Sequence, residues 1–248
     1  MPSPQSAIIA SLHRGQNQVD LIRWRGRVVV RKRRAAHHHY RYAKEQQWLA
    51  TAGDLGIPVP PVVAALASDR HLDLLLVKAP SHASHRYPWQ PKQWLHRLAP
   101  LHALPAAAQG WGPLRADGQA RWPSLDAASA WYRQELQRLA PPAVVRLDQD
   151  LERTLSAAQR GLIHGDCHRG NRAGAWIIDW ETVAIADPWE EAARAGLSGG
   201  WGLAAWGLAC GADLAGPRWR GAILRAAIEA AGHPGPRQAA AQRWLTLA

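Results

Sequence analysis

The sequence predicts an α+β chain with two lobes: a small, mostly antiparallel β lobe with one helix, then a larger and mostly helical lobe. Short apolar runs separated by turn residues fill the first 80 residues, which is typical of β-hairpins. Residues 79–91 are polar and contain prolines, as a connection between lobes does. Alanine-rich helical patterns dominate from residue 92 onward. We therefore expect one lobe over residues 1–80 and a second over residues 81–248.

In the first lobe, residues 18–24 and 27–32 read as two strands joined by a turn at Arg25-Gly26. A helix is expected over residues 36–53. Three prolines exclude helix from residues 57–63. A second hairpin follows, with strands at residues 62–67 and 73–78.

The second lobe is expected to be helical around residues 94–104, 125–140 and 148–160. Residues 161–181 interrupt this pattern, because two short apolar runs flank a polar loop there.

The net charge of +11 fits an anionic ligand such as a nucleotide, and also nucleic acid or an anionic surface. Seven basic residues lie between Arg23 and Arg34, yet no zinc-finger or RNP-type pattern accompanies them, so nucleic acid is not the expected partner. No stretch approaches the ~20 apolar residues of a membrane span. Two cysteines without metal-ligand spacing and a start that lacks a secretion signal favour a cytoplasmic protein. The oligomeric state is left open.

The polar loop carries residues suited to phosphoryl transfer. Asp166 and Asn171 are five residues apart beside two glycines, and Asp179 follows the second apolar run. Phosphoryl transfer needs a carboxylate beside the attacking hydroxyl and oxygen ligands that hold Mg²⁺ against the phosphates. A hairpin would bring these three side chains together. The same spacing occurs in the catalytic loop of kinases.

The strings HGDCHRGN (residues 164–171) and IIDWE (177–181) resemble the hallmark of the aminoglycoside phosphotransferase and choline kinase family. The resemblance implies a protein-kinase-like fold, with ATP and Mg²⁺ as cofactors and a small hydroxyl-bearing molecule as acceptor. It also implies that Asp166 is the catalytic base and that Asn171 and Asp179 hold the metal. His164 and His168 would brace the loop.

The first lobe carries weaker features of the same family. Residues 14–17 resemble its phosphate-covering loop, which assigns Gly15 and Asn17 to the nucleotide. Glu45 stands where the family has the glutamate that pairs with a basic residue in contact with the phosphates. Arg31 and Lys32 are both candidates for that basic residue, and strand alternation lets only one face the nucleotide. A hinge strand from Leu74 to Lys78, Val77 among them, would bind adenine through its backbone.

The acceptor is left open by the sequence, and aminoglycoside-type antibiotics and choline-like or thiamine-like alcohols all remain candidates. The resemblance places Asp187 behind the site, and four acidic residues are candidates for acceptor binding: Glu181, Asp187, Glu190 and Glu191. One alternative is a degenerate kinase-like protein that binds nucleic acid through its basic lobe. Another is a metal-dependent hydrolase built on His164, Asp166, His168 and Asp179, which would give Glu45 no role.

Overall fold

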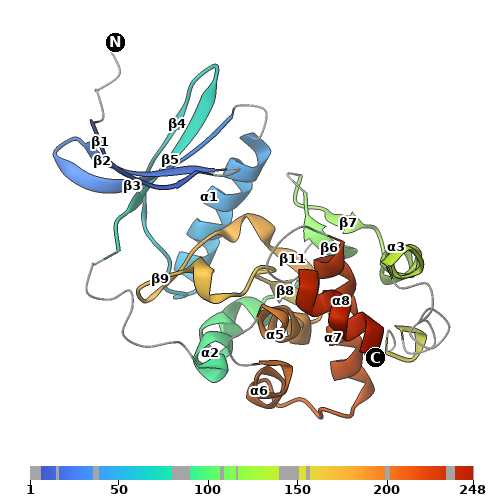
Figure 1. Cartoon of the computed structure of the whole chain (residues 1–248). Coiled ribbons are helices and arrows are strands. Elements are labelled where there is room, and N and C mark those ends of the chain that lie inside the picture. Colours follow the sequence, from blue (N-terminus) through green and yellow to red (C-terminus); the bar gives the residue numbers. More distant parts are fainter. Residues whose placement is uncertain are drawn as a thin grey trace. The chain divides into compact units, whose positions relative to one another are not determined.

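The computed structural model describes the chain except for residues 1–6, 15–16, 36–38, 80–89, 107–108, 116, 140–150, 155–156, 199–201, 233–237 and 248. The fold is the predicted α+β class, with an antiparallel sheet first and a largely helical part after it (Figure 1). Residue contacts divide the chain into two compact units. The first holds residues 1–87 and 170–181, and the second holds residues 88–169 and 182–248. Residues 170–181, expected in the helical lobe, therefore group with the β unit.

The first unit is a five-stranded antiparallel sheet with one long helix. Its strand order is β1-β2-β3-β5-β4, so β1 and β4 are the edges (Figure 1). The elements are β1 (Ala7–Arg14), β2 (Gln18–Trp24), β3 (Arg27–Ala35), α1 (His39–Asp54), β4 (Val62–Ala67) and β5 (His71–Val77).

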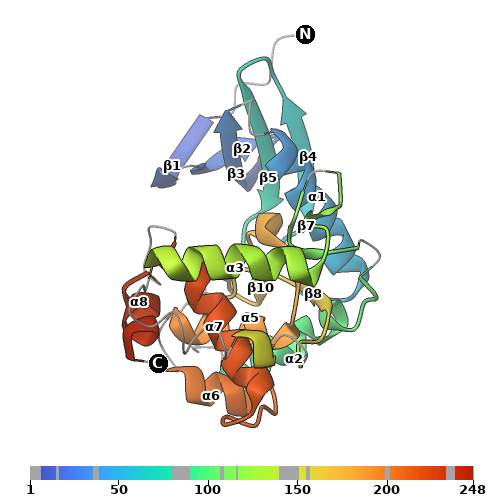
Figure 2. The ribbon, with the colours of Figure 1, turned by 90° about the vertical axis from the view of Figure 1, so that its right-hand side faces the viewer.

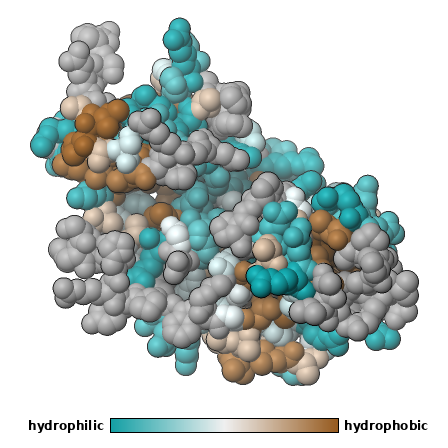
Figure 3. All heavy atoms as spheres, in the orientation of Figure 1, coloured by the Kyte–Doolittle hydropathy of each residue, from teal (hydrophilic) through white to brown (hydrophobic). Residues whose placement is uncertain are grey.

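Both predicted hairpins and the helix are confirmed, with small changes at their ends. Arg25 and Gly26 both have positive φ (48° and 78°), the backbone that a two-residue turn between twisted strands requires. β3 runs three residues beyond the predicted end, and β5 begins at His71 rather than at residue 73. Strand β1 was not predicted. Its apolar side chains Ile8, Ile9 and Leu12 are about half exposed, and Figure 3 shows hydrophobic surface at this end of the unit.

The basic run of β3 is explained by the register of the sheet. Arg31 lies directly opposite Asp20 on β2, and Arg33 lies opposite Asp73 on β5. Both pairs form ion pairs, at 2.5 Å and 2.6 Å, on the face of the sheet that also buries Val29. Side chains alternate along a strand, so Lys32 and Arg34 point to the other face. Tyr42 of α1 donates a hydrogen bond to the Lys32 carbonyl, which places α1 against that face.

A short hairpin completes the first unit, and it differs from the expected one, because the second apolar run pairs with residues 172–173 and not with residues 161–163. Strands β9 (Arg172–Ala173) and β10 (Trp176–Ile177) pair antiparallel, and the ladder continues because the Ile178 N–H donates to the Asn171 carbonyl at 3.0 Å. The Ile177 N–H donates to the Pro58 carbonyl at 2.8 Å. The hairpin is thereby joined to the proline-containing segment before β4.

The second unit contains six helices among the described residues and a small sheet. Its elements are α2 (Pro91–His102), β6 (Trp111–Leu114), β7 (Ala120–Trp122), α3 (Leu125–Leu139), β8 (Gly161–Ile163), β11 (Ala184–Ala186), α5 (Pro188–Leu197), α6 (Gly202–Ala209), α7 (Pro217–Ala231) and α8 (Gln238–Leu247). The buried helix α5 packs against α6 and α7, and α3 lies alongside α7 (Figure 2). The chain passes from one unit to the other within two 3₁₀ turns, Arg169–Asn171 and Trp180–Thr182.

The four-stranded sheet of this unit, with the order β7-β6-β11-β8, was not predicted. Its strands are three or four residues long, and β6 contains Gly112 and Pro113. Gly112 has φ +92°, and a Cβ there would lie 2.3 Å from the Trp122 ring. Of the expected helix at residues 148–160, residues 151–154 are helical, while residues 148–150 and 155–156 lie outside the described residues.

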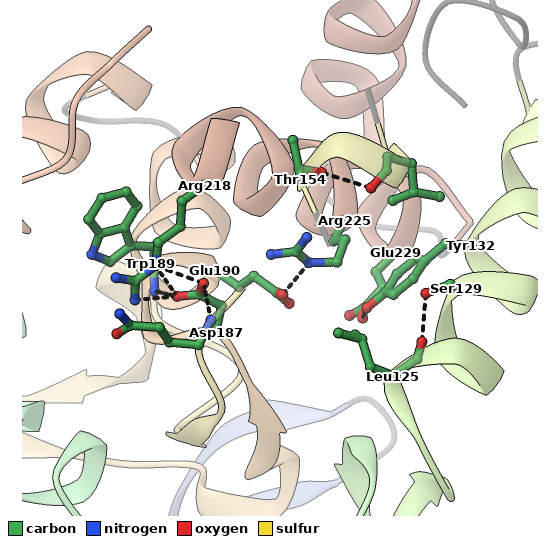
Figure 4. A network of polar contacts seen from close by, with 12 residues as sticks. Leu125, Ser129, Tyr132, Thr154, Asp187, Trp189, Glu190, Arg218, Arg225 and Glu229 are labelled. Atoms are coloured by element: carbon green, nitrogen blue, oxygen red, sulfur yellow. Dashed lines mark hydrogen bonds and ion pairs between the residues drawn. The ribbon is translucent and has the colours of Figure 1, made fainter. Parts of the chain in front are cut away.

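Buried ion pairs join the helices of the second unit (Figure 4). Glu190 of α5 accepts a hydrogen bond from Arg225 of α7 at 2.5 Å, and both side chains are fully buried. Arg194 of α5 pairs with Glu229 of α7 at 2.6 Å, and Glu229 also accepts from the Tyr132 hydroxyl at 2.7 Å. None of the described helices combines the length and the apolar character needed to cross a membrane.

Candidate active site

Lys32 is the centre of charge in the first unit. Its Nζ lies 2.8 and 2.9 Å from the two carboxylate oxygens of Glu45 on α1, and 2.7 Å from Asp179 Oδ1. Burial alone would lower the pKa of Lys32, but the charges of Glu45 and Asp179 outweigh it and raise that pKa above the ordinary value. Lys32 therefore stays protonated at neutral pH and can act as a fixed positive charge.

Arg31 and Lys32 were the two candidates for the basic residue of β3 that contacts the phosphates. The structure brings Lys32, and not Arg31, to Glu45. Arg31 is on the opposite face of the sheet, where Asp20 holds its guanidinium. Burial would raise the pKa of Asp20, but hydrogen bonds from Arg31 and Ser11 outweigh it and lower that pKa. Both partners are therefore charged and engaged. Arg31 is not available to a nucleotide on the Glu45 face.

Asp179 directly follows the β9–β10 hairpin and has a strained backbone. Its φ is +68°, in the left-handed region that a residue with a Cβ seldom adopts. Such conformations cost on the order of 1–3 kcal/mol, and persist when the surrounding structure holds them. Trp180 is fully buried and its indole N–H donates to the Ile177 carbonyl at 3.0 Å. The hairpin places Asn171, which is buried, and Asp179, which is partly exposed, at the same, open end.

The oxygen donors around Asp179 suit a hard cation. Carboxylate oxygens of Glu45, Asp179 and Glu181 lie within 4.8 Å of one another, and Asn171, whose side chain also has an oxygen, lies at the same end of the hairpin. Mg²⁺ prefers oxygen ligands, so the donor set fits it. Glu45 and Glu181 are already paired, with Lys32 and Arg34 respectively. Asp179 is paired with Lys32 as well, so these ion pairs do not rank the three carboxylates, and the choice of Asn171 and Asp179 as direct ligands rests on the family resemblance.

The second unit contains the loop with Asp166. Asp166 is partly exposed, and its carboxylate lies 3.5 Å from His168 Nε2. The backbone N–H of Asp166 donates to His164 Nδ1 at 3.3 Å, and His164 is fully buried. Gly165 has φ +85°, and a Cβ there would lie 2.3 Å from the Thr182 carbonyl oxygen. A glycine is therefore required at this turn.

The structure gives all four predicted acceptor residues other partners, and Glu181 is the one that pairs with Arg34. Asp187, Glu190 and Glu191 are fully buried, which does not support direct contact with an acceptor. Asp187 caps α5 by accepting from the Trp189 N–H and pairs with Arg218 at 2.8 Å. Glu190 pairs with Arg225 as described above. The positions of these carboxylates in the sequence do not show that they point into the unit.

Glu191 holds the loop that carries Asp166. Its carboxylate accepts hydrogen bonds from the backbone N–H groups of His164 and Gly165, the latter at 3.2 Å. Burial alone would raise the pKa of Glu191, but the neighbouring His102 and His164 side chains outweigh it and hold that pKa below its ordinary value. The charged carboxylate is thus part of what fixes the loop.

This arrangement predicts a loss of stability in acid. A carboxyl group whose pKa is lowered by folding stabilises the fold above its unfolded pKa, and this contribution disappears as the pH falls through the lower, folded value. The melting temperature should therefore decrease as the pH falls below the ordinary pKa of a glutamate, about 4.3, and the Glu191→Gln variant should lose less over that range because its contribution is already absent. Thermal unfolding from pH 3 to 7 measures this. Glu152→Gln, at an exposed ion pair, is the control, and equal acid sensitivity in all three proteins would contradict the assignment.

The remaining nucleotide candidates are only partly described. Gly15 lies outside the described residues. Asn17 is half-buried, and its side-chain oxygen is buried without a hydrogen-bond partner among the described residues. The Val77 N–H already donates to the Pro61 carbonyl at 3.0 Å, so that group is not available to adenine. The structure therefore does not support a hydrogen bond from the Val77 N–H to adenine.

Two residues near Lys32 were not predicted from the sequence as part of the site. Arg34 forms a buried ion pair with Glu181, and Tyr42 packs under it with its hydroxyl on the Lys32 carbonyl. Spacing could have indicated Arg34, because it follows Lys32 by two residues and so shares its face of β3. Its partner could not be found this way, since Glu181 is far away in the sequence.

A strand lysine paired with a helix glutamate, an Asp-and-Asn loop and a following aspartate define the protein-kinase-like class of phosphotransferases. A sequence model of the phosphotransferase enzyme family matches residues 11–241, and the chain belongs to that family.

Solved structures of this class are similar to the chain throughout its length, although their sequences have diverged. Aminoglycoside phosphotransferase APH(4)-Ia is 16% identical, with a TM-score of 0.70 over 96% of this chain and 91% of the other. Macrolide 2'-phosphotransferase MphH from Brachybacterium faecium is 18% identical, with a TM-score of 0.57 over 96% and 90%. APH(3'')-Id from Streptomyces rimosus ATCC10970 is 18% identical, with a TM-score of 0.56 over 89% and 91%. A search of curated protein sequences found no match.

Proposed function

We propose that the protein transfers the γ-phosphoryl group of ATP to a hydroxyl group of a small molecule, with Mg²⁺ as the metal. The observation that carries this proposal is the buried Lys32, whose ammonium joins Glu45 on α1 and Asp179 after the hairpin. A lysine fixed in this way can contact nucleotide phosphates while an aspartate beside it binds their metal. Similar structures were solved with AMP-PNP or ADP and hygromycin B, which supports ATP as the donor.

In the proposed reaction, each part of the site has one task. Lys32 holds the phosphates, and Asn171 and Asp179 hold Mg²⁺, which when bound neutralises charge on the phosphate oxygens. Asp166 orients the acceptor hydroxyl and takes its proton as the new oxygen–phosphorus bond forms and the bond to ADP breaks. His164 and His168 keep the Asp166 loop in place, consistent with their contacts to it.

The acceptor is the open part of the proposal, and charge pairing favours one that carries few positive charges. A polycationic aminoglycoside needs carboxylates that are not already neutralised. Five acidic side chains of the second unit are paired with arginines instead: Glu135 with Arg138, Glu152 with Arg133, Asp187 with Arg218, Glu190 with Arg225 and Glu229 with Arg194. Among the candidates, choline-like or thiamine-like alcohols and uncharged sugars therefore rank above aminoglycosides. An ADP-release screen over these classes tests the ranking.

The two alternatives receive less support. Four of the seven residues of the basic run form ion pairs within the first unit, and Arg23, Arg25 and Arg27 are the exposed ones. A nucleic-acid surface needs basic groups that are free to pair with phosphates. For the hydrolase, the group of acidic, histidine or cysteine side chains found close enough to hold a metal, within the described part of the chain, contains no histidine.

Calorimetric titration of ATP, with and without Mg²⁺, tests the proposed function. The native protein should bind ATP more tightly with Mg²⁺. Asp179→Ala should lose that gain, with the affinity for Mg²⁺-ATP falling at least about tenfold, because the metal loses a ligand. Glu152→Gln, at an exposed pair of the second unit, should bind like the native protein. The absence of ATP and GTP binding by the native protein under every condition would refute the proposal.

A further inference from the structure

We infer that Glu181 is a positioning residue: through its buried ion pair with Arg34 it holds Asp179 in the orientation needed for Mg²⁺-nucleotide binding. This inference rests on the proposed function, since it assigns the metal to Asp179. It replaces the sequence-based suggestion that Glu181 contacts the acceptor. All the residues involved belong to the first unit.

The register of two segments creates the pair. Lys32 and Arg34 are two residues apart on β3 and therefore project from the same face of the strand. Asp179 and Glu181 are also two residues apart. Lys32 pairs with Asp179 at 2.7 Å, and Arg34 pairs with Glu181. Two parallel ion pairs thus join β3 to residues 179–181, and one of them contains the proposed metal ligand.

Glu181 lies among basic groups and away from solvent. Its side chain is 13% exposed, and that of Arg34 is 2% exposed. Arg41 of α1 approaches the other carboxylate oxygen at 3.9 Å. Burial lowers the pKa of Lys44, on the same helix, to about 8, and the Glu181 charge acts in the opposite direction. The Glu181 carboxylate is therefore engaged by β3 and faces the basic side chains of α1.

The backbone of Asp179 explains why a neighbouring pair matters for it. With φ at +68°, this residue would relax toward ordinary negative φ unless both of its sides were held. The preceding side is held by the Ile177 and Ile178 N–H groups, which donate to the Pro58 and Asn171 carbonyls. The following side is held by buried Trp180 and by Glu181 on Arg34. When the Glu181–Arg34 pair is lost, buried Trp180 remains as the main contact that restrains the following side of Asp179.

The test compares Glu181→Gln with a matched control. Asp73→Asn removes a carboxylate from Arg33, which is also on β3 but on the opposite face. Titrations of ATP into each variant, with and without Mg²⁺, separate metal-dependent from metal-independent binding. Glu181→Gln should weaken Mg²⁺-ATP binding about tenfold, as expected when an outer partner of a metal ligand is lost, and should leave Mg²⁺-free ATP binding unchanged. Asp73→Asn should change neither.

A double-mutant cycle shows whether the two side chains act as one unit. Arg34→Met should weaken Mg²⁺-ATP binding as Glu181→Gln does, and the double variant should be no weaker than the worse single variant. Arg34→Lys, which keeps the charge, should recover part of the loss, and thermal unfolding verifies that each variant is folded.

Three results would overturn the inference: native-like Mg²⁺ dependence in Glu181→Gln, an equal loss with and without Mg²⁺, or additive effects in the cycle. ATP binding that fails in the native protein would instead refute the proposed function.

Discussion

Replacement of Asp166 by asparagine is expected to lower the rate of phosphoryl transfer by about 10²- to 10⁴-fold, the range that a positioned general base contributes. The affinity for Mg²⁺-ATP should change little. Asp166 is assigned to the acceptor hydroxyl, whereas Lys32, Asn171 and Asp179 are assigned to the nucleotide and its metal. Asparagine has nearly the same shape and keeps an oxygen that can accept a hydrogen bond, but it cannot take up the proton.

The measurement pairs steady-state ADP release, with the best acceptor from the screen, with calorimetric titration of Mg²⁺-ATP. A fall in kcat with unchanged nucleotide affinity supports the assignment, since the lost interaction then belongs to the transition state. Glu152→Gln, in an exposed pair of the same unit, should keep both values. Transfer at the native rate by Asp166→Asn would show that another group takes the proton, and an equal loss of ATP affinity would show a structural role instead.

The sequence was sufficient to predict features that depend on neighbouring residues. The hairpin around Arg25 and Gly26 could be predicted because a two-residue turn with positive φ has a strong local signature. The hairpin predicted around the polar loop was only partly right: the run at residues 161–163 pairs with β11 and not with β10, while the shorter hairpin β9–β10 brings Asn171 and Asp179, without Asp166, to one end. Where the prediction was right, fewer than ten residues separate the partners, so local backbone geometry determines the outcome.

Features that depend on distant partners could not be predicted. Sequence alternation separated Arg31 from Lys32, but only the fold shows that Asp20 faces one and Glu45 the other. The small sheet of the second unit has strands too short for a periodic pattern, and β6 includes a proline. The carboxylates of α5 illustrate the same limit: Glu190 and Glu191 were expected near an acceptor, yet both are buried by α7 and by the Asp166 loop.

The role of the basic run between Arg23 and Arg34 also depends on distant partners. A run of seven basic residues suggests a surface for anions when it is read as composition. In the sheet, alternate members face opposite sides, and cross-strand acids meet them on one side while Glu45, Asp179 and Glu181 meet them on the other. Most of the local charge therefore stabilises the first unit and fixes Lys32, since a charge buried this deeply is tolerated only when it is paired.

The second large effect is expected at the ion pair between α5 and α7. Glu190→Ala should lower the free energy of unfolding by about 3–5 kcal/mol, because it leaves the Arg225 charge buried without its carboxylate. Arg225 has little else to pair with, as its two terminal nitrogens find no hydrogen-bond partner within the described part of the chain. Glu152→Ala, which breaks an exposed pair with Arg133, should cost no more than about 1 kcal/mol.

Urea unfolding followed by tryptophan fluorescence and circular dichroism measures these differences, and a double variant separates two explanations. If the cost of Glu190→Ala comes from the unpaired charge, then Glu190→Met combined with Arg225→Met should be more stable than Glu190→Ala, since apolar residues of similar volume can replace a buried pair. If the cost comes from lost packing between α5 and α7, Glu190→Met alone, which restores the volume but leaves Arg225 unpaired, should recover as much stability as the double variant. Because α5 also carries Glu191, which holds the Asp166 loop, the Glu190–Arg225 pair stabilises the same helix from which that loop is held.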